Sequence, residues 1–165
     1  MDPMVKDLFF DFPDLSHLGR VFIRLAAAAL LGGVIGFERE IERRSAGLRT
    51  HMLVALGAAL FTVIPLEAGM NVADLTRVIQ GVATGIGFLG AGTIIKLSEQ
   101  YEVRGLTSAA AVWVTAAVGM SVGAGYLWPG LLAALLAWFI LAILRGVDEW
   151  VRRHNEGSSE GPNRR

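Results

Sequence analysis

Five apolar stretches, each long enough for a helix, constrain this chain more than any other feature of its sequence. They cover residues 20–37, 51–70, 78–97, 105–127 and 128–146. A transmembrane helix needs about 20 apolar residues to cross a hydrocarbon core about 30 Å thick. Since the chain has 165 residues, five crossings leave little room for a soluble domain. We therefore expect an all-α membrane protein, a bundle of about five transmembrane helices.

A soluble helical core is the alternative, and the fifth stretch argues against it. An amphipathic helix of a soluble protein carries a polar stripe at helical spacing. Residues 131–141 read LLAALLAWFIL and have no polar face. The composition, 53% hydrophobic and 18% charged residues, also departs from that of soluble domains.

The segments that flank these stretches divide the chain into three parts. Residues 1–19 carry four aspartates and one lysine, the reverse of the basic leader of a signal peptide. The transmembrane domain is expected over residues 20–146. The basic tail, residues 147–165, is expected to be disordered because it has too few apolar residues after 152 to fold.

The distribution of Lys and Arg predicts an orientation. With the N-terminus outside, the inner segments carry eleven of these residues and the outer segments carry the remaining four of 15. The positive-inside rule then places the C-terminus in the cytoplasm. The eleven are Arg39, Arg43, Arg44, Arg49, Lys96, Arg104, Arg145, Arg152, Arg153, Arg164 and Arg165.

Several kinds of chemistry have no support in the sequence. The chain has no cysteine, which excludes disulfides, cysteine zinc sites and thiol nucleophiles. His51 is far in sequence from the other two histidines, so it is expected to be a hydrogen-bonded or interfacial residue rather than a metal ligand. The acidic residues cluster outside the apolar stretches, and the formal net charge is zero. We expect neither an enzyme nor a nucleic-acid-binding protein, and we assign no catalytic, cofactor or metal site.

The third stretch is rich in glycine. Residues 85–90 match the G-x-G-x-x-G pattern, but a dinucleotide site requires that pattern between a strand and a helix. Glycines four residues apart instead allow membrane helices to pack closely. The same spacing occurs at Gly32 and Gly36, at Gly81 and Gly85, and at Gly119 and Gly123. The alternative is that five glycines within residues 81–92 unwind the helix and expose carbonyl groups to an ion.

Charged residues also mark the end of the first stretch. Residues 38–44 read EREIERR, and alternating charges at this spacing favour a solvated helix end with salt bridges. Glu38 is the residue of most interest there because it lies nearest the predicted bilayer. Arg24, one helical turn after Arg20, is expected to extend its charged group toward the outer interface.

Four ordered sequence blocks resemble the MgtC/SapB family. They are GGVIGFERE at 32–40, AGLRTHMLVALG at 46–57, GIGFLGAGTI at 85–94 and VRGLTSAA at 103–110, and the resemblance covers roughly residues 20–145. It implies a bacterial inner-membrane protein linked to adaptation to low magnesium. Some members have a soluble C-terminal domain, which this sequence does not provide after residue 152. The candidate functional or packing residues are Glu38, Arg49, Asp74, Arg77, Gln80, Gly81, Gly85, Gly87, Gly90, Gly92, Thr93 and Thr107.

Two functions remain open at this point. In the first, the chain is a non-catalytic module that acts through helix contacts in the lipid bilayer, as a homo-oligomer, with the dimer as the expected state, or on another membrane protein. In the second, it transports magnesium or another cation along the third helix, with Asp74 and Glu38 at the two mouths of the path. Mg²⁺ enters either hypothesis only as a sensed or transported ion. The second is weaker because no acidic residue lies deep within a stretch.

Overall fold

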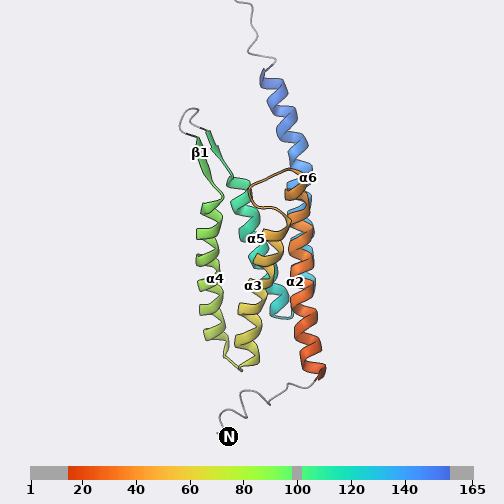
Figure 1. The fold of residues 1–165 in the computed structure, drawn as a ribbon, viewed down its shortest axis with the longest axis vertical. Coiled ribbons are helices and arrows are strands. Elements are labelled where there is room, and N and C mark those ends of the chain that lie inside the picture. Colours follow the sequence, from red (N-terminus) through yellow and green to blue (C-terminus); the bar gives the residue numbers. More distant parts are fainter. Residues whose placement is uncertain (1–14, 98–101, 157–165) are drawn as a thin grey trace, which may run out of the picture.

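Five helices that lie side by side along one long axis make up most of the described chain (Figure 1). The structure is a computed structural model that describes residues 15–97 and 102–156, with the backbone alone for 95–97, 102–104 and 144–156. The helices are α2 (Leu15–Ile41), α3 (Leu48–Glu67), α4 (Val72–Gly92), α5 (Leu106–Gly123) and α6 (Leu127–Glu156). Two short antiparallel strands, β1 (Ile95–Leu97) and β2 (Glu102–Arg104), join α4 to α5.

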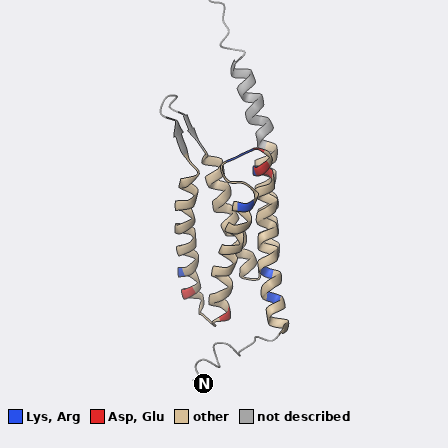
Figure 2. Ribbon diagram, viewed as in Figure 1, with Lys and Arg blue, Asp and Glu red and all other residues tan. Residues whose placement is uncertain are grey.

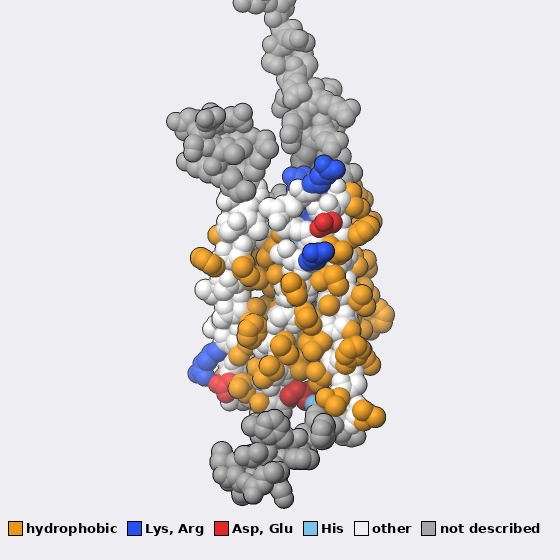
Figure 3. All heavy atoms as spheres, viewed as in Figure 1, with side chains coloured by type: hydrophobic (Ala, Val, Ile, Leu, Met, Phe, Trp, Pro, Cys, Tyr) orange, Lys and Arg blue, Asp and Glu red, His pale blue; other side chains and the backbone are white. Residues whose placement is uncertain are grey.

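Each predicted stretch overlaps one helix, so the all-α membrane fold is confirmed. Helices α2, α3 and α5 have the length and apolar composition of membrane spans, and α6 adds a shorter apolar segment, Leu127–Ile143. Helix α4 is not among these candidates. The middle of the bundle has an apolar surface, and the charged side chains gather toward its two ends (Figures 2 and 3).

The third predicted stretch, 78–97, is displaced from the helix that forms there. Helix α4 begins at Val72 because Asn71 caps it, its side chain accepting a hydrogen bond of 3.0 Å from the backbone N–H of Asp74. The helix ends at Gly92, and the hydroxyl of Thr93 donates to the carbonyl oxygen of Gly90 at 2.7 Å. Residues 95–97 form β1, which pairs with β2, and do not continue the helix.

Helix α6 is longer than the sequence pattern suggested. It continues to Glu156, so the first ten residues of the tail that we expected to be disordered, 147–156, are helical. Acidic residues at 148 and 149 precede arginines at 152 and 153 by four positions, a spacing that favours helix. The rest of the tail, and residues 1–14 of the acidic segment, lie outside the described residues.

The connections alternate between the two ends of the bundle (Figure 1). The loop 42–47, the β-hairpin and the C-terminal end of α6 lie at one end, which we call the hairpin end. The α3–α4 and α5–α6 connections lie at the other. The α5–α6 turn spans only residues 124–126, with Gly125 at a φ of +91°, a left-handed conformation that glycine adopts without strain.

Small residues bring α2, α3 and α5 into close contact. A Cβ atom at Gly32 would lie 2.5 Å from the carbonyl oxygen of His51, and one at Gly123 would lie 2.5 Å from that of Ala59. A Cβ atom at Gly119 would collide with the carbonyl oxygen of Ala55. The glycine spacing on α2 and α5 therefore does what the sequence predicted, which is to let helix backbones touch.

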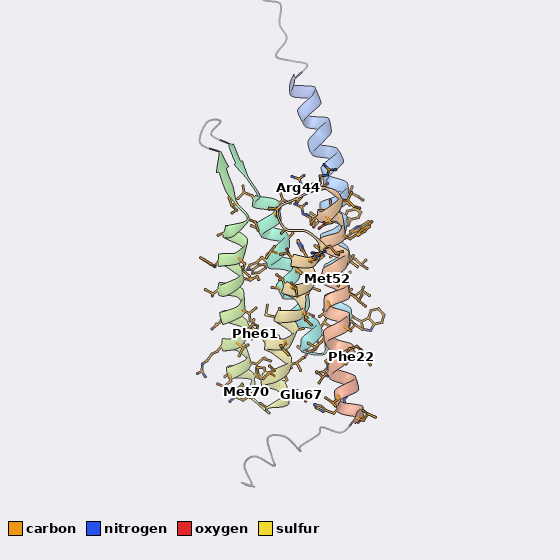
Figure 4. The ribbon with its side chains drawn as sticks, in the orientation of Figure 1. Phe22, Arg44, Met52, Phe61, Glu67 and Met70 are labelled. Carbon is orange, nitrogen blue, oxygen red and sulfur yellow. The ribbon has the colours of Figure 1, made fainter. Side chains whose placement is uncertain are left out.

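Helix α4 is packed differently. It lies mainly against α5 and has few contacts with α3. Between α3 and α4 runs an apolar groove of about 600 Å³, whose lining includes Phe61, Gly81 and Gly85; Figure 4 shows Phe61 on the α3 side. No described atom would lie within 4 Å of a Cβ at Gly81 or Gly85. The close packing that we expected at this pair does not occur within the chain.

Candidate functional site

The last turn of α2 carries a group of buried charges at the hairpin end. Glu38 is 6% exposed and Arg39 is 2% exposed, and the side chain of Glu42 is also 6% exposed. The expectation of a solvated helix end was therefore wrong for these three residues, although the expected salt bridges are present. The first turns of α3 and α5 and the loop 42–47 cover this part of α2.

Arg39 is the centre of the group. Its Nη2 atom donates to the Oγ atom of Ser108 on α5 at 3.1 Å. Its Nη1 atom lies 3.5 Å from a carboxylate oxygen of Glu38 and 3.5 Å from one of Glu42. The Nε atom of Arg44 lies 2.9 Å from the same oxygen of Glu42. One guanidinium thus connects the end of α2 to the start of α5.

The hydrogen bonding of this group is incomplete. Among the described residues, neither carboxylate oxygen of Glu38 nor the Nε atom of Arg39 has a hydrogen-bond partner. A buried charged group that lacks partners loses its hydration without full compensation. Charged residues in such positions of a membrane protein are functional candidates by default.

The loop that follows α2 is fixed by side chains on both sides. A carboxylate oxygen of Glu40 accepts a hydrogen bond of 2.9 Å from the backbone N–H of Leu48. The Nδ1 atom of His51 donates to the carbonyl oxygen of Gly47 at 2.8 Å. His51 is fully buried, so of the two expected alternatives the structure shows a hydrogen-bonded histidine rather than an exposed interfacial one. Arg43 has a φ of 52°, a left-handed conformation that is uncommon for a residue with a side chain.

A small polar cavity of about 230 Å³ lies beside these charges. It opens between the α2–α3 loop, the C-terminal end of α4 and the start of α5. We refer to it below as the polar cavity. Its lining residues are Glu42, Arg43, Arg44, Ser45, Thr93, Gly105 and Ser108.

The opposite end of the bundle carries simpler ion pairs. Asp74 pairs with Arg77 on the exposed first turns of α4, with 2.6 Å between oxygen and nitrogen. Glu67, at the end of α3, pairs with His17 and lies 4.0 Å from Arg24. Arg24 is therefore held at this end of α2, as expected for a residue near the interface, and Figure 4 shows Glu67 and Arg44 at opposite ends of the bundle.

The remaining candidate residues are dispersed. Arg49, Gln80 and Thr107 are exposed, and no described atom would lie within 4 Å of a Cβ at Gly87 or Gly92. Gly90 is buried, and a Cβ there would lie 3.4 Å from the carbonyl oxygen of Ala109. Of the candidates, only Glu38 belongs to the group of buried charges, and only Thr93 lines the polar cavity.

Sequence reasoning missed three members of the site, Arg39, Glu42 and Ser108. The spacing of Glu38, Arg39 and Glu42 puts all three within one helical turn, which was a usable signal. Ser108 carried no comparable signal, because only the fold brings α5 against α2.

Metal binding has little support in this arrangement. Within residues 15–97 and 102–156, no three histidine, aspartate or glutamate side chains come together as a set that could hold a metal ion. Arg39 already lies 3.5 Å from both buried carboxylates, so a cation there would face a fixed positive charge.

Apolar helices with charges at both ends define the chain as an integral membrane protein. The family model described as the MgtC family matches residues 25–150, so the chain belongs to the MgtC family and the resemblance in its sequence is confirmed. No solved structure matches the chain significantly.

Three relatives illustrate this membership. Protein SrpB of Synechococcus elongatus is 40% identical over 154 residues, covering 86% of this chain and 84% of that protein. Protein MgtC of Brucella abortus is 49% identical over 122 residues, covering 73% of this chain and 50% of that protein. YhiD of Escherichia coli K12, named "Putative magnesium transporter YhiD", is 38% identical over 128 residues, covering 73% of this chain and 59% of that protein. The chain thus aligns with about half the length of the Brucella protein.

Proposed function

We propose that this chain is a bacterial inner-membrane protein of magnesium homeostasis and that it acts as a non-catalytic module through helix contacts. Membership of the MgtC family and the magnesium-related name of the E. coli relative support the magnesium connection. The absence of an assignable catalytic constellation in the sequence supports a role other than catalysis. The polar groups of the described site form ion pairs and hydrogen bonds with one another.

The open face of α4 is the observation that carries this proposal. Gly81 and Gly85 line an apolar groove and have no described atom within 4 Å of where a Cβ would be. In a bilayer, helices associate through close backbone packing at small residues. A second copy of the chain, with its own α4 glycines, presents a matching surface to this face. We therefore propose a homodimer that packs through α4.

A cation transporter remains the second candidate because of the name of the E. coli relative. The path along α4 required an unwound segment, but α4 is continuous from Val72 to Gly92. Asp74, at one proposed mouth, is engaged with Asn71 and Arg77, and Glu38, at the other, is buried beside Arg39. These observations favour the module.

Cross-linking can test the dimer directly, because the chain has no native cysteine. Gly85→Cys should form disulfide-linked dimers in native membranes, whereas Leu136→Cys, on the exposed face of α6, should not. Gly85→Leu should prevent dimer formation and growth in low magnesium while leaving the folded monomer intact, because nothing described lies near Gly85 within the chain. If neither Gly81→Cys nor Gly85→Cys forms cross-linked dimers, and cells with Gly85→Leu grow normally in low magnesium, the proposed interface is wrong.

A flux assay distinguishes the two functions. Liposomes that contain the purified chain should show no more Mg²⁺ flux than empty liposomes if the module proposal holds. Flux that depends on the protein would favour the transporter instead.

The proposed orientation has the N-terminus outside and the C-terminus in the cytoplasm. The eleven-to-four division of Lys and Arg supports it. An impermeant thiol reagent should label Met70→Cys in intact cells but should label Ser45→Cys only after permeabilisation. Both positions are exposed, so the opposite result would reverse the orientation.

A further inference from the structure

The polar cavity at the hairpin end differs from the apolar groove in the charges that surround it. Arg43 and Arg44 line it directly. Behind its wall lies the guanidinium of Arg39, since both Ser108 and Glu42, its partners at 3.1 and 3.5 Å, line the cavity. Three arginines therefore surround a space of about 230 Å³.

The negative charges nearby are already neutralised in part. Glu42 is the carboxylate that lines the cavity, and it lies within 3.5 Å of Arg39 and 2.9 Å of Arg44. Glu38 lies beside Arg39 and is not among the lining residues. The lining residues themselves carry Arg43 and Arg44 against Glu42, a balance of one positive charge.

The start of α5 adds a second source of positive potential. Gly105 lines the cavity and forms the N-cap of this 18-residue helix, but it supplies no side-chain acceptor to the first turn. The first N–H groups of a helix have no acceptor within the helix, and its dipole attracts negative charge. A helix N-terminus combined with arginines is a common arrangement for binding phosphate.

Buried polar groups lie next to the cavity. Arg39, whose side chain is 3% exposed, donates to the Oγ atom of the lining residue Ser108, and its Nε atom has no described hydrogen-bond partner. Thr93 also lines the space. One water occupies about 30 Å³ in the liquid, so the volume admits a group several times larger than water.

We propose that the polar cavity binds a phosphate group, supplied either by the headgroup of an anionic phospholipid or by a soluble phosphate compound. Both sources present the same tetrahedral anion to Arg43, Arg44 and the start of α5. The cavity lies where α2 ends and α3 begins, at one end of the apolar bundle. We place this end at the lipid headgroups, where basic pockets bind anionic lipids. The proposal does not depend on the helix contacts of α4.

Binding can be measured on the purified full chain by two routes. Native mass spectrometry after extraction from vesicles of phosphatidylcholine with phosphatidylglycerol tests the lipid source. Thermal unfolding in detergent with added inorganic phosphate, against chloride at equal ionic strength, tests the soluble source, because a ligand that binds the folded state raises its stability. Wild-type protein should retain phosphatidylglycerol, be stabilised by phosphate, or both.

Variants distinguish phosphate binding at the polar cavity from a non-specific attraction of phosphate to surface charge. Arg43→Gln should weaken binding about tenfold without lowering the melting temperature, since loss of one charged contact worth about 1.4 kcal/mol corresponds to that factor. Arg44→Gln should weaken it similarly, although this change also releases Glu42. Arg49→Gln is the matched control, because Arg49 is exposed near the same end of the bundle and does not line the cavity.

Each outcome bears on the proposal. Retention of phosphatidylglycerol alone identifies a lipid headgroup, and stabilisation by phosphate alone identifies a soluble ligand. Binding that falls equally in Arg43→Gln and Arg49→Gln, or that survives both cavity variants, would overturn the site. So would the absence of binding by either route.

Discussion

Glycines four residues apart occur on α2 and α5 and also on α4, but the two sets differ in what lies next to them. On α2 and α5, at Gly32, Gly36, Gly119 and Gly123, an added Cβ would meet the backbone or side chains of α3. On α4, at Gly81 and Gly85, it would meet open space. The first set closes the bundle and the second faces outward. Spacing alone therefore identifies a surface for close approach but does not say which helix approaches it.

The largest expected effect is the difference in stability loss between removing a buried charge of the group around Arg39 and removing an exposed charge of α4. Arg39→Met removes the shared partner of Glu38 and Glu42, and breaking a buried ion pair costs about 3–5 kcal/mol. Arg77→Met removes a partner from an exposed pair, which contributes about 0–1 kcal/mol. Unfolding in detergent should show a large loss of stability for the first variant and a small one for the second. Equal losses would mean that Arg39 is not the centre of the charged group.

The glycine comparison can be tested by adding a single methyl group. Gly119→Ala should destabilise the protein by up to about 3 kcal/mol, the upper part of the range for overpacking, because the new Cβ collides with the backbone of Ala55. In detergent at a concentration where the chain is monomeric, Gly85→Ala should be neutral or stabilising by up to about 1 kcal/mol, since nothing within the chain lies near the new Cβ and alanine favours helix. Melting temperatures of both variants provide the measurement. A stable Gly119→Ala protein would contradict the close contact between α3 and α5.

A smaller effect is expected at the connection between α2 and α5. Ser108→Ala removes the hydroxyl that accepts from Arg39, and hydrogen bonds to charged groups contribute about 1.5–3 kcal/mol. Thr107→Ala, at an exposed neighbouring position, is the control and should change stability little. If both substitutions have the same effect, the bond between Arg39 and Ser108 does not stabilise the fold.

The smallest effect concerns Gly90, the one α4 glycine in contact with α5. Gly90→Ala places a Cβ 3.4 Å from the carbonyl oxygen of Ala109, so a small steric cost opposes a helix-propensity gain of about 1 kcal/mol. We expect stability within about 1 kcal/mol of wild type and normal growth in low magnesium. A well-folded variant that fails to grow would instead favour an ion path along α4.

The sequence predicted the helices well because each apolar stretch has the length that a bilayer requires. It placed α4 inaccurately, because the helix begins at its Asn71 cap, ahead of the apolar stretch, and the last apolar residues, 95–97, form a strand. It could not predict the burial of Arg39, because that burial depends on Ser108, which is 69 residues away in the chain. The position of Glu38 nearest the predicted bilayer drew attention to that residue before its burial was known.

The extra length of α6 has a mechanical consequence. Its apolar segment ends at Ile143, yet the helix continues to Glu156 and projects beyond the other helices (Figure 1). Thirteen further residues at 1.5 Å per residue give a stem of about 20 Å. Glu156 therefore lies about 20 Å beyond the end of the apolar segment, and a small tilt of α6 gives a larger sideways displacement there.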